Sequence, residues 1–341
     1  MIGSSYGTVS SHRPVFALTM GDPAGIGPEI ACKALEVPEF RRHVVVVGDY
    51  TIMNLTARRL KTGVVFREMA VIHDFQPGMA NILTIGGIDP ATLEAGTSRA
   101  SYGMAAYTYI DKGIELALNG EVDGVITNPI NKESLRAAGL NYPGHTEIFA
   151  EKTGIQHFSM LFLLRNVGVA HVTTHCSLRR AIEMISADRV ISHIRLLHDA
   201  MIRLGVPSPR IAVGGLNPHA GENGLFGMEE IDHIVPAIKR AGEDGMKVSG
   251  PYPPDTVFMR AFRGEFDGVV AMLHDHGFVA LKSMDFEHGV NITIGLPIIR
   301  TSVGHGTAFN IAGKNCASPR SLLAAFDAAR RLYHGPGCSN E

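Results

Sequence analysis

Three histidines stand at the ends of segments that predict buried strands. They are His175 in VAHVTTH, His219 in GLNPHAGE and His274 in MLHDHG. Because α/β sheets place ligand-binding groups at the carboxyl ends of their strands, the fold could gather these imidazoles around one metal. Asp275 is a candidate partner that would orient the His274 ring, and His276 competes with His274 as the ligand. An extended strand would hold His171 and His175 ~13 Å apart, so those two rings are not expected to share a metal. The alternative is that each ring is an ordinary hydrogen-bonded structural group.

A cation far downstream, Arg300, is a candidate for anion binding. It follows an apolar run at residues 294–299 and precedes Thr301 and Ser302. A guanidinium in such surroundings indicates a buried carboxylate or phosphate, because arginine binds these oxyanions in a bidentate way. The alternative is an ion pair between domains or between subunits.

Two glycine-rich segments predict close approaches of the backbone. Residues 21–29 read GDPAGIGPE, where the glycines permit a tight turn and Pro28 suits the start of a helix that could face an anion. This is no dinucleotide fingerprint, because Ile30 stands where the last glycine of GxGxxG is required, and a plain strand-to-helix turn is the alternative. Residues 305–314 read HGTAFNIAGK, whose small residues favour either contact with a flat ligand or close helix packing.

The elements that must position these groups alternate along the chain. Short apolar runs predict strands at 15–20, 44–48, 82–85, 124–127, 159–164, 169–173, 211–214, 268–273 and 291–294. Between them, helical patterns cover 28–35, 104–118, 131–138, 187–204, 228–241 and 321–332. This alternation predicts an α/β architecture with a largely parallel sheet.

Composition excludes several classes of protein. The chain has 341 residues, enough for about two domains, with 45% hydrophobic and 19% charged residues. A formal charge of −2 and the lack of a basic run argue against nucleic-acid binding, and no apolar stretch is long enough to span a membrane. The first 14 residues lack the apolar core of a signal peptide, and the four cysteines form no CxxC pair. We therefore expect a cytoplasmic enzyme with free thiols.

Together these motifs resemble the PdxA family, the 4-hydroxythreonine-4-phosphate dehydrogenases of pyridoxine biosynthesis and their close relatives. The matching stretches run from about residue 20 to almost 315 and read GDPAGIGPE, TNPINK, PGHTE, VTTH, NPHAGE, PPDTVF, HDHG, NITIGLPIIRTS and HGTAFNIAGK. The last of them is also similar to the adenosine-binding loop of isocitrate and isopropylmalate dehydrogenases.

The resemblance implies a two-domain α/β/α architecture like that of isocitrate and isopropylmalate dehydrogenases. It places residues 14–135 and 285–341 in a discontinuous first domain and residues 136–284 in the second. It also implies a homodimer, in which the active site lies in the cleft between the domains and the partner subunit completes it.

The resemblance further implies roles for individual residues. A divalent metal (zinc, magnesium, cobalt or manganese) would be bound by His175, His219 and His274. The small anionic substrate would be held by His145, Thr146, Lys282, Asn291 and Arg300. NAD, or NADP, would be bound by His305, Gly306, Thr307 and Asn310. Lys282 is the expected proton carrier, with Asp275 beside the metal.

The implied reaction is an NAD- and metal-dependent oxidation of a secondary alcohol, with decarboxylation of the β-keto acid formed. The implied substrate is a phosphorylated hydroxy acid, either 4-phosphohydroxythreonine or a threonate or erythronate 4-phosphate. The alternatives are a terephthalate cis-dihydrodiol dehydrogenase and a non-catalytic ligand-binding relative. Gly304, Asn310 and His276 depart from the residues usual in the family (Asp, Asp and Gln), which leaves the exact substrate open.

Overall fold

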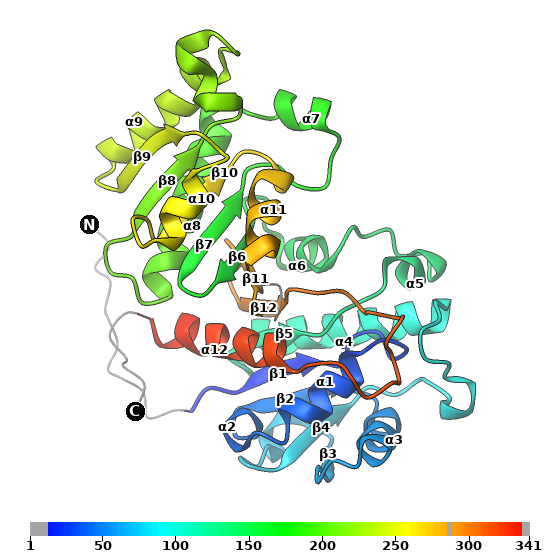
Figure 1. Ribbon diagram of the computed structural model, residues 1–341. Coiled ribbons are helices and arrows are strands. Elements are labelled where there is room, and N and C mark those ends of the chain that lie inside the picture. The colour runs from blue at the N-terminus through cyan, green and yellow to red at the C-terminus, as the bar shows by residue number, and fades with distance from the viewer. Residues whose placement is uncertain (1–12, 285–287, 336–341) are drawn as a thin grey trace.

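The strands of the described residues, 13–284 and 288–335 of this computed structural model, form one sheet of 12 strands (Figure 1). In spatial order they are β3 (Phe66–Met69), β4 (Ala80–Thr84), β2 (Val44–Gly48), β1 (Phe16–Thr19), β5 (Gly124–Thr127), β12 (Ile299–Val303), β11 (Val290–Ile294), β6 (Ser159–Leu164), β7 (Val167–His171), β10 (Gly268–Ala271), β8 (Arg210–Gly214) and β9 (Lys247–Tyr252). Strand β11 runs antiparallel to β12 and β6, and β6 runs antiparallel to β7. The other neighbouring strands are parallel, which confirms the predicted α/β class with a largely parallel sheet.

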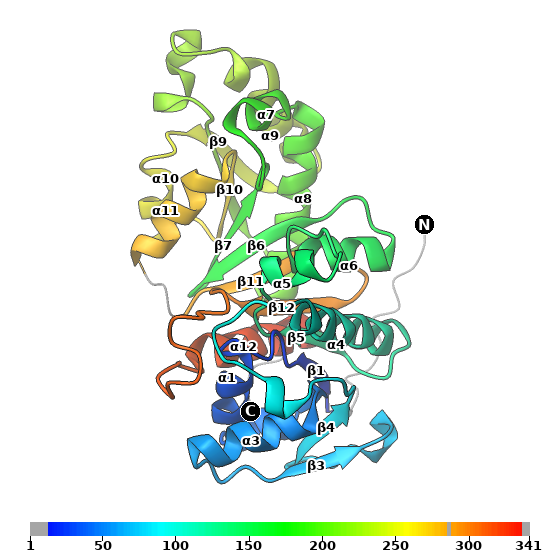
Figure 2. The same ribbon diagram turned by 90° about the vertical axis from the view of Figure 1, so that its right-hand side faces the viewer.

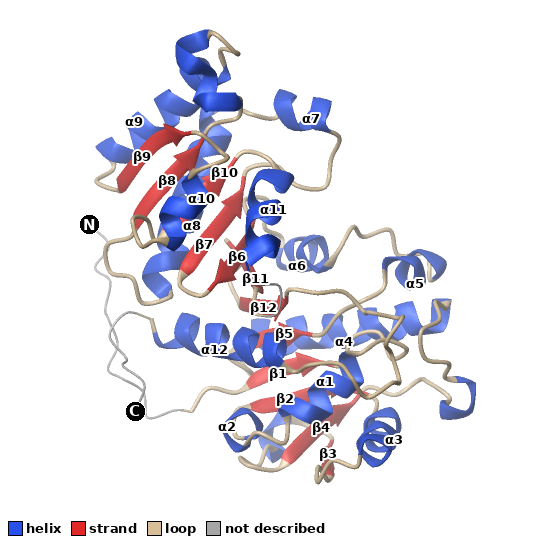
Figure 3. Ribbon diagram, in the orientation of Figure 1, coloured by secondary structure: helices blue, strands red, loops and turns tan. Residues whose placement is uncertain are grey.

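Helices cover the strands on both faces (Figure 3). They are α1 (Gly27–Ala34), α2 (Pro38–Arg41), α3 (Tyr50–Leu60), α4 (Ala100–Leu118), α5 (Lys132–Ala137), α6 (His145–Thr153), α7 (Leu178–Glu183), α8 (Ala187–Arg203), α9 (Val235–Glu243), α10 (Val257–Phe262), α11 (His274–Met284) and α12 (Arg320–His334). Short 3-10 turns lie at η1 (Ile72–Asp74), η2 (Pro90–Thr92) and η3 (Pro218–Gly224). The region expected as one helix at 228–241 is a π-helical segment, η4 (Glu230–Ile234), followed by α9.

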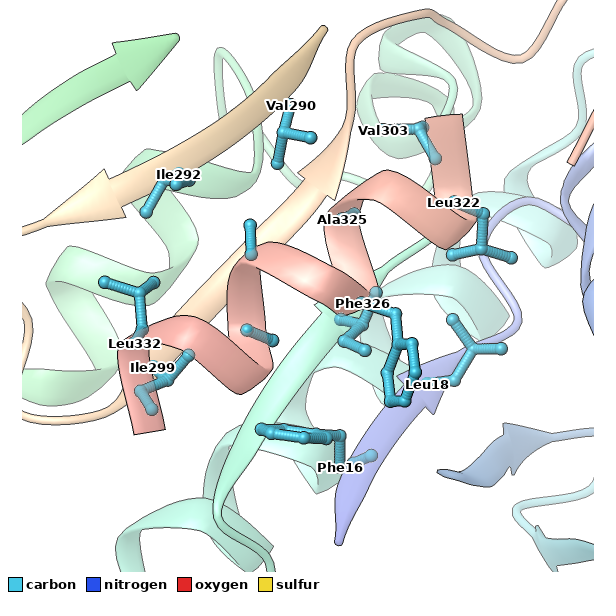
Figure 4. Packing of buried hydrophobic residues seen from close by; sticks show 14 of the residues in the cluster. Phe16, Leu18, Val290, Ile292, Ile299, Val303, Leu322, Ala325, Phe326 and Leu332 are labelled. Carbon is cyan, nitrogen blue, oxygen red and sulfur yellow. The ribbon is translucent and has the colours of Figure 1, made fainter. Parts of the chain in front are cut away.

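The centre of the sheet is sandwiched between α12 and α4. Phe326 of α12 meets Phe16 of β1 edge to face, with ring centroids 6.1 Å apart (Figure 4). Side chains alternate along a strand, so Thr19 points to the opposite face. There α4 lies so close that a Cβ added at Gly113 would come 3.4 Å from the Thr19 methyl and 3.2 Å from Val125. Both faces are therefore filled, and only the strand ends remain open to ligands.

The strands that carry the predicted metal ligands are covered in the same way. Cβ atoms added at the paired residues Gly168 of β7 and Gly268 of β10 would contact Leu197 of α8. The alternate residues of both strands pack against Phe278 of α11. The turned view shows α8 and α11 on opposite sides of these strands (Figure 2).

Three strands do not follow from the apolar pattern, and the reasons are physical. Strands β3 and β9 are the outermost strands of the sheet, so their side chains are only partly buried and form no continuous apolar run. Strand β12 is wholly buried but contains Arg300, Thr301 and Ser302, so it has no apolar run by which the sequence could predict it.

The predicted domain borders stay a prediction. In Figure 1, β1–β5 form the lower part of the molecule and β6–β10 the upper part. The chain after residue 288 returns to supply β11 and β12 between β5 and β6. Residues 285–287 and 336–341 of the predicted first domain lie outside the described residues.

Two smaller expectations concern thiols and membranes. Cys32, Cys176 and Cys316 are free thiols, as predicted, whereas Cys338 lies outside the described residues. Among the described helices, none combines the length and the apolar character needed to cross a bilayer.

Candidate functional site

A buried arginine whose hydrogen-bond partners among the described residues are all neutral lies at the centre of the candidate site. Arg300 of β12 is 2% exposed and donates hydrogen bonds to Thr127 Oγ1 (2.9 Å) and Thr293 Oγ1 (3.0 Å). It also approaches Asn291 Oδ1 at 3.4 Å, and its Nε has no partner among the described residues. Burial lowers the pKa of Arg300 to about 9, although the Glu147 carboxylate opposes this shift. Because its partners are neutral oxygens, this guanidinium is available to an anion.

The first turn of α6 supplies two further predicted substrate residues. His145 and Thr146 begin this helix instead of lying in a loop, and the Thr146 hydroxyl lies 3.4 Å from that of Thr293. Burial, followed by the charge of Arg300, holds the pKa of His145 well below its usual value, so the imidazole is neutral. The N-cap residue, Gly144, has no side chain to cap α6, so backbone N–H groups at this helix start could bind an anion.

A cavity of about 190 Å³ brings these groups together. Its lining residues include His145, Thr146, Asn291 and Arg300 of the predicted substrate site, His305 and Gly306 of the predicted cofactor site, and His175 of the predicted metal site. A second hollow of about 650 Å³ adjoins it through Thr146, Glu147, Met160 and His175, which line both. The combined space is of the size that small-molecule sites occupy.

The structure brings two of the three predicted metal ligands together. The rings of His175 and His274 lie 5.9 Å apart between centroids. Strand β7 ends at His171, and His175 lies on the loop that follows it. The centroid of the His171 ring lies 6.2 Å from that of His274. His219 is 72% exposed on η3 and forms no contact with the other two rings. Within the described part of one chain, no three side chains are placed to hold one metal.

The orientation of the rings nevertheless suits metal binding. Each presents Nδ1 to a carboxylate, at 3.9 Å for His175 and Glu147, 3.8 Å for His219 and Glu222, and 2.8 Å for His274 and Asp275. Only the His274 contact is a hydrogen bond, and in all three rings the arrangement would leave Nε2 free for a metal. The predicted partnership of Asp275 with His274 is therefore present as a hydrogen bond.

The two glycine-rich segments pack against each other. Ile26 N–H donates to the carbonyl of Thr307 at 3.1 Å, and a Cβ added at Gly25 would meet the Thr307 side chain at 3.0 Å. Thr307 is thus largely buried in this contact, whereas Asn310 is exposed. Gly306 faces open space beside the cavity, where a flat ligand has room.

Lys282 lies away from the cavity. It is exposed on α11, and its Nζ lies 5.3 Å from the centroid of the Phe278 ring, which in turn lies 4.5 Å from the His274 ring. Conversely, the side chains of Thr127, Glu147 and Lys132 belong to the site but were not predicted for it. Their positions within TNPINK and PGHTE were the available signal.

Close packing explains why residue 304 is a glycine in this chain. A Cβ at Gly304 would come 2.7 Å from the carbonyl oxygen of Gly289 and 3.2 Å from the Phe162 ring. Ser321 joins the same two glycines, accepting from Gly304 N–H and donating to the Gly289 carbonyl. Side chains at 304 are therefore excluded next to His305.

The glycine-rich turn contains a titratable group with a testable effect. Asp22 is wholly buried; its Oδ1 accepts from Ala24 N–H, and its Oδ2 has no partner among the described residues. Burial raises the pKa of this carboxyl from 3.8 to about 6, although the Ala24 N–H and the Ser134 hydroxyl oppose the shift. The protonated form is thus favoured in the folded state, and stability present below pH ~4 is lost as the pH rises through about 6.

We expect Asp22→Asn to remove this loss. The difference in unfolding free energy, variant minus parent, should be about 1–2 kcal/mol larger at pH 8 than at pH 5, so that the variant gains relative stability at the higher pH. Urea denaturation of both proteins at the two pH values measures the difference. An equal effect at both pH values would contradict the assignment.

Comparison with known proteins places the chain in a family. A family model described as "Pyridoxal phosphate biosynthetic protein PdxA" matches residues 40–329, which is most of the 341-residue chain. The chain therefore belongs to the PdxA family, and the resemblance found in its motifs is confirmed.

Individual relatives are dehydrogenases. The 4-hydroxythreonine-4-phosphate dehydrogenase of Beijerinckia indica is 48% identical over 319 residues, covering 93% of this chain and 94% of the relative. The D-threonate 4-phosphate dehydrogenase of Salmonella typhimurium is 45% identical over 320 residues, covering 93% and 98%. The crystal structure of 4-hydroxythreonine-4-phosphate dehydrogenase from Klebsiella pneumoniae has a TM-score of 0.82 at 41% identity, covering 94% and 99%. These matches confirm the predicted enzyme class, an oxidoreductase of the dehydrogenase type.

Proposed function

We propose that this protein is an NAD- and divalent-metal-dependent dehydrogenase that oxidises the secondary alcohol of a phosphorylated hydroxy acid. The substrates we propose are 4-phosphohydroxythreonine and threonate or erythronate 4-phosphate, in keeping with the names of the relatives. The observation that carries this proposal is the buried guanidinium of Arg300 beside the cavity, whose hydrogen-bond partners in the described part of the chain are neutral oxygens.

The phosphate is bound in the cavity where Arg300 and the donors at the start of α6 converge. Arg300 supplies the charge, and the neutral His145 and the hydroxyl of Thr146 supply further donors at the α6 N-terminus. Asn291 lines the same cavity and orients the substrate. Because most of these groups are held within the fold, they are preorganised for the substrate.

A metal and a nicotinamide cofactor complete the chemistry. His175, His219 and His274 would hold zinc, magnesium, cobalt or manganese through Nε2, and such a metal lowers the pKa of a bound alcohol and polarises the carbonyl that forms. His305 and Gly306, with Thr307 and Asn310 on the same loop, would bind NAD or NADP, which accepts the hydride lost by the alcohol carbon.

The oxidised product is a β-keto acid, and we propose that it loses CO2 in the site. The electron pair of the broken C–C bond is then left on the neighbouring carbon, which must take up a proton. Lys282 is the proposed carrier of that proton, because its amine can donate one and its Nζ lies over the Phe278 ring, which also contacts His274; in one chain it lies outside the cavity lining.

We also propose that the enzyme is a homodimer in which a second copy supplies the third imidazole. His175 and His274 already face each other in one chain, whereas His219 is exposed on η3 and apart from both. Leu225 and Phe226, which follow it, are 72% and 49% exposed. An exposed apolar segment beside a ligand is typical of an interface.

Turnover of 4-phosphohydroxythreonine and of D-threonate 4-phosphate with NAD tests the proposal directly. We expect NADH formation from the phosphorylated substrates, competition by inorganic phosphate, loss of activity in a chelator and its recovery with added metal. The unphosphorylated compounds should react far more slowly, because Arg300 would then be left buried without an anion.

Three outcomes would contradict parts of this proposal. Undiminished turnover in the chelator would exclude the metal. Activity on a dihydrodiol dicarboxylate without competition by phosphate would favour the terephthalate cis-dihydrodiol alternative. Calorimetry without any heat of NAD binding would favour a non-catalytic relative.

A further inference from the structure

Of the three carboxylates that the described residues place beside the predicted metal ligands, Glu147 is the one that lies far from its histidine in sequence. Asp275 and Glu222 follow their histidines by one and three residues. Glu147 instead comes from the first turn of α6 and reaches His175 on the loop after β7. This pairing is thus a product of the fold.

Glu147 lies where the two hollows of the candidate site meet. Glu147 lines both the 190 Å³ and the 650 Å³ hollows, and it follows His145 and Thr146 in the same helical turn. Its Oε2 is buried, and a Cβ at Gly144 would lie 3.4 Å from it, so this oxygen is turned back toward the helix start. Oε1 is the atom that faces His175 Nδ1, at 3.9 Å.

We propose that Glu147 is a positioning residue for the metal ligand His175. An acceptor at Nδ1 favours the tautomer that carries its proton there, so that the lone pair of Nε2 faces the metal. The separation of 3.9 Å exceeds a hydrogen bond, but contacts of this kind in unliganded sites commonly shorten when the ligand binds. This inference rests on the proposed metal site.

The same carboxylate also affects the anion site, where its negative charge opposes the binding of a phosphate. Its charge stabilises the cationic form of Arg300, and it lies in the cavity that would receive a phosphate. Removing the charge should therefore weaken metal binding while leaving phosphate binding unchanged or slightly tighter. A purely structural role at the start of α6 would instead weaken both, because His145 and Thr146 occupy the same turn.

Glu147→Gln and Glu147→Ala test the proposal, with Glu151→Gln as a matched control. Glu151 lies one turn later on α6 and accepts a hydrogen bond from the Tyr142 hydroxyl, remote from His175. Calorimetric titration of the metal-free, full-length proteins with Zn²⁺ alone, and separately with inorganic phosphate, provides the two readouts. We expect Zn²⁺ affinity to fall about 10- to 100-fold in Glu147→Ala, with a smaller loss in Glu147→Gln. Glu151→Gln should match the parent.

The possible results separate this inference from the proposed function. If the parent binds Zn²⁺ and both Glu147 variants bind it within twofold of the parent, the positioning role is wrong while the metal site stands. If the Zn²⁺ and phosphate affinities fall together, Glu147 stabilises the start of α6 and does not orient His175, and the inference is again wrong. If the parent binds neither Zn²⁺ nor, in the same titration, Mg²⁺, Co²⁺ or Mn²⁺, the metal-dependent function fails, and the inference fails with it.

Discussion

Arg300→Met is expected to lower kcat/KM for the phosphorylated substrate by roughly 10- to 100-fold or more, since each charged hydrogen bond contributes about 1.5–3 kcal/mol. The loss should appear mainly in KM, and the affinity for inorganic phosphate should fall with it. The reason is that Arg300 is a buried cation in the cavity wall, and its hydrogen bonds to described residues go to neutral oxygens of Thr127, Thr293 and Asn291.

The same substitution should leave the fold intact. Loss of the hydrogen bonds to the neutral oxygens is offset by relief from burying a cation, so the free energy of unfolding should stay within about 1 kcal/mol of the parent. Arg210→Met is the control, because Arg210 is an exposed arginine bound to Asp267 and lies outside the cavity lining. An unchanged kcat/KM for Arg300→Met would reject the anion site.

His175→Ala and His219→Ala should each lower activity by about 100-fold or more, because each removes a ligand of the metal that activates the alcohol. Coexpression of the two variants should restore activity. If His219 comes from the second copy, the mixed dimer contains one site in which all three ligands are intact. Random pairing then yields about a quarter of the parent's active sites.

A matched mixture distinguishes this arrangement from a rearrangement within one chain. Coexpressed His175→Ala and His274→Ala should stay inactive. The same chain supplies both of these ligands to a site, with rings 5.9 Å apart, so every site in the mixture lacks one of them. Differently tagged chains allow the mixed dimer to be purified and its bound metal to be counted. Absence of recovery in the His175 and His219 mixture would contradict the shared site.

Local patterns predicted much of the fold, because they report properties that neighbouring residues share. Continuous apolar runs predicted the wholly buried strands β1 and β2, and helical patterns predicted α8 and α12 within one or two residues at most ends. The same patterns failed at β12, because Arg300, Thr301 and Ser302 interrupt its apolar run although all three are buried. They also missed α6 and α11, whose first residues are the polar groups of the candidate site.

Residue types and motif order were enough to indicate the family and the kinds of group that the site would need. Which groups meet was decided only by the tertiary structure, since distances between residues far apart in sequence depend on how strands pair and helices pack. Strand pairing carries Arg300 to Thr127, and the start of α6 places Glu147 beside His175. Packing also leaves His219 exposed on η3, apart from the other two rings, which no spacing along the chain could have predicted.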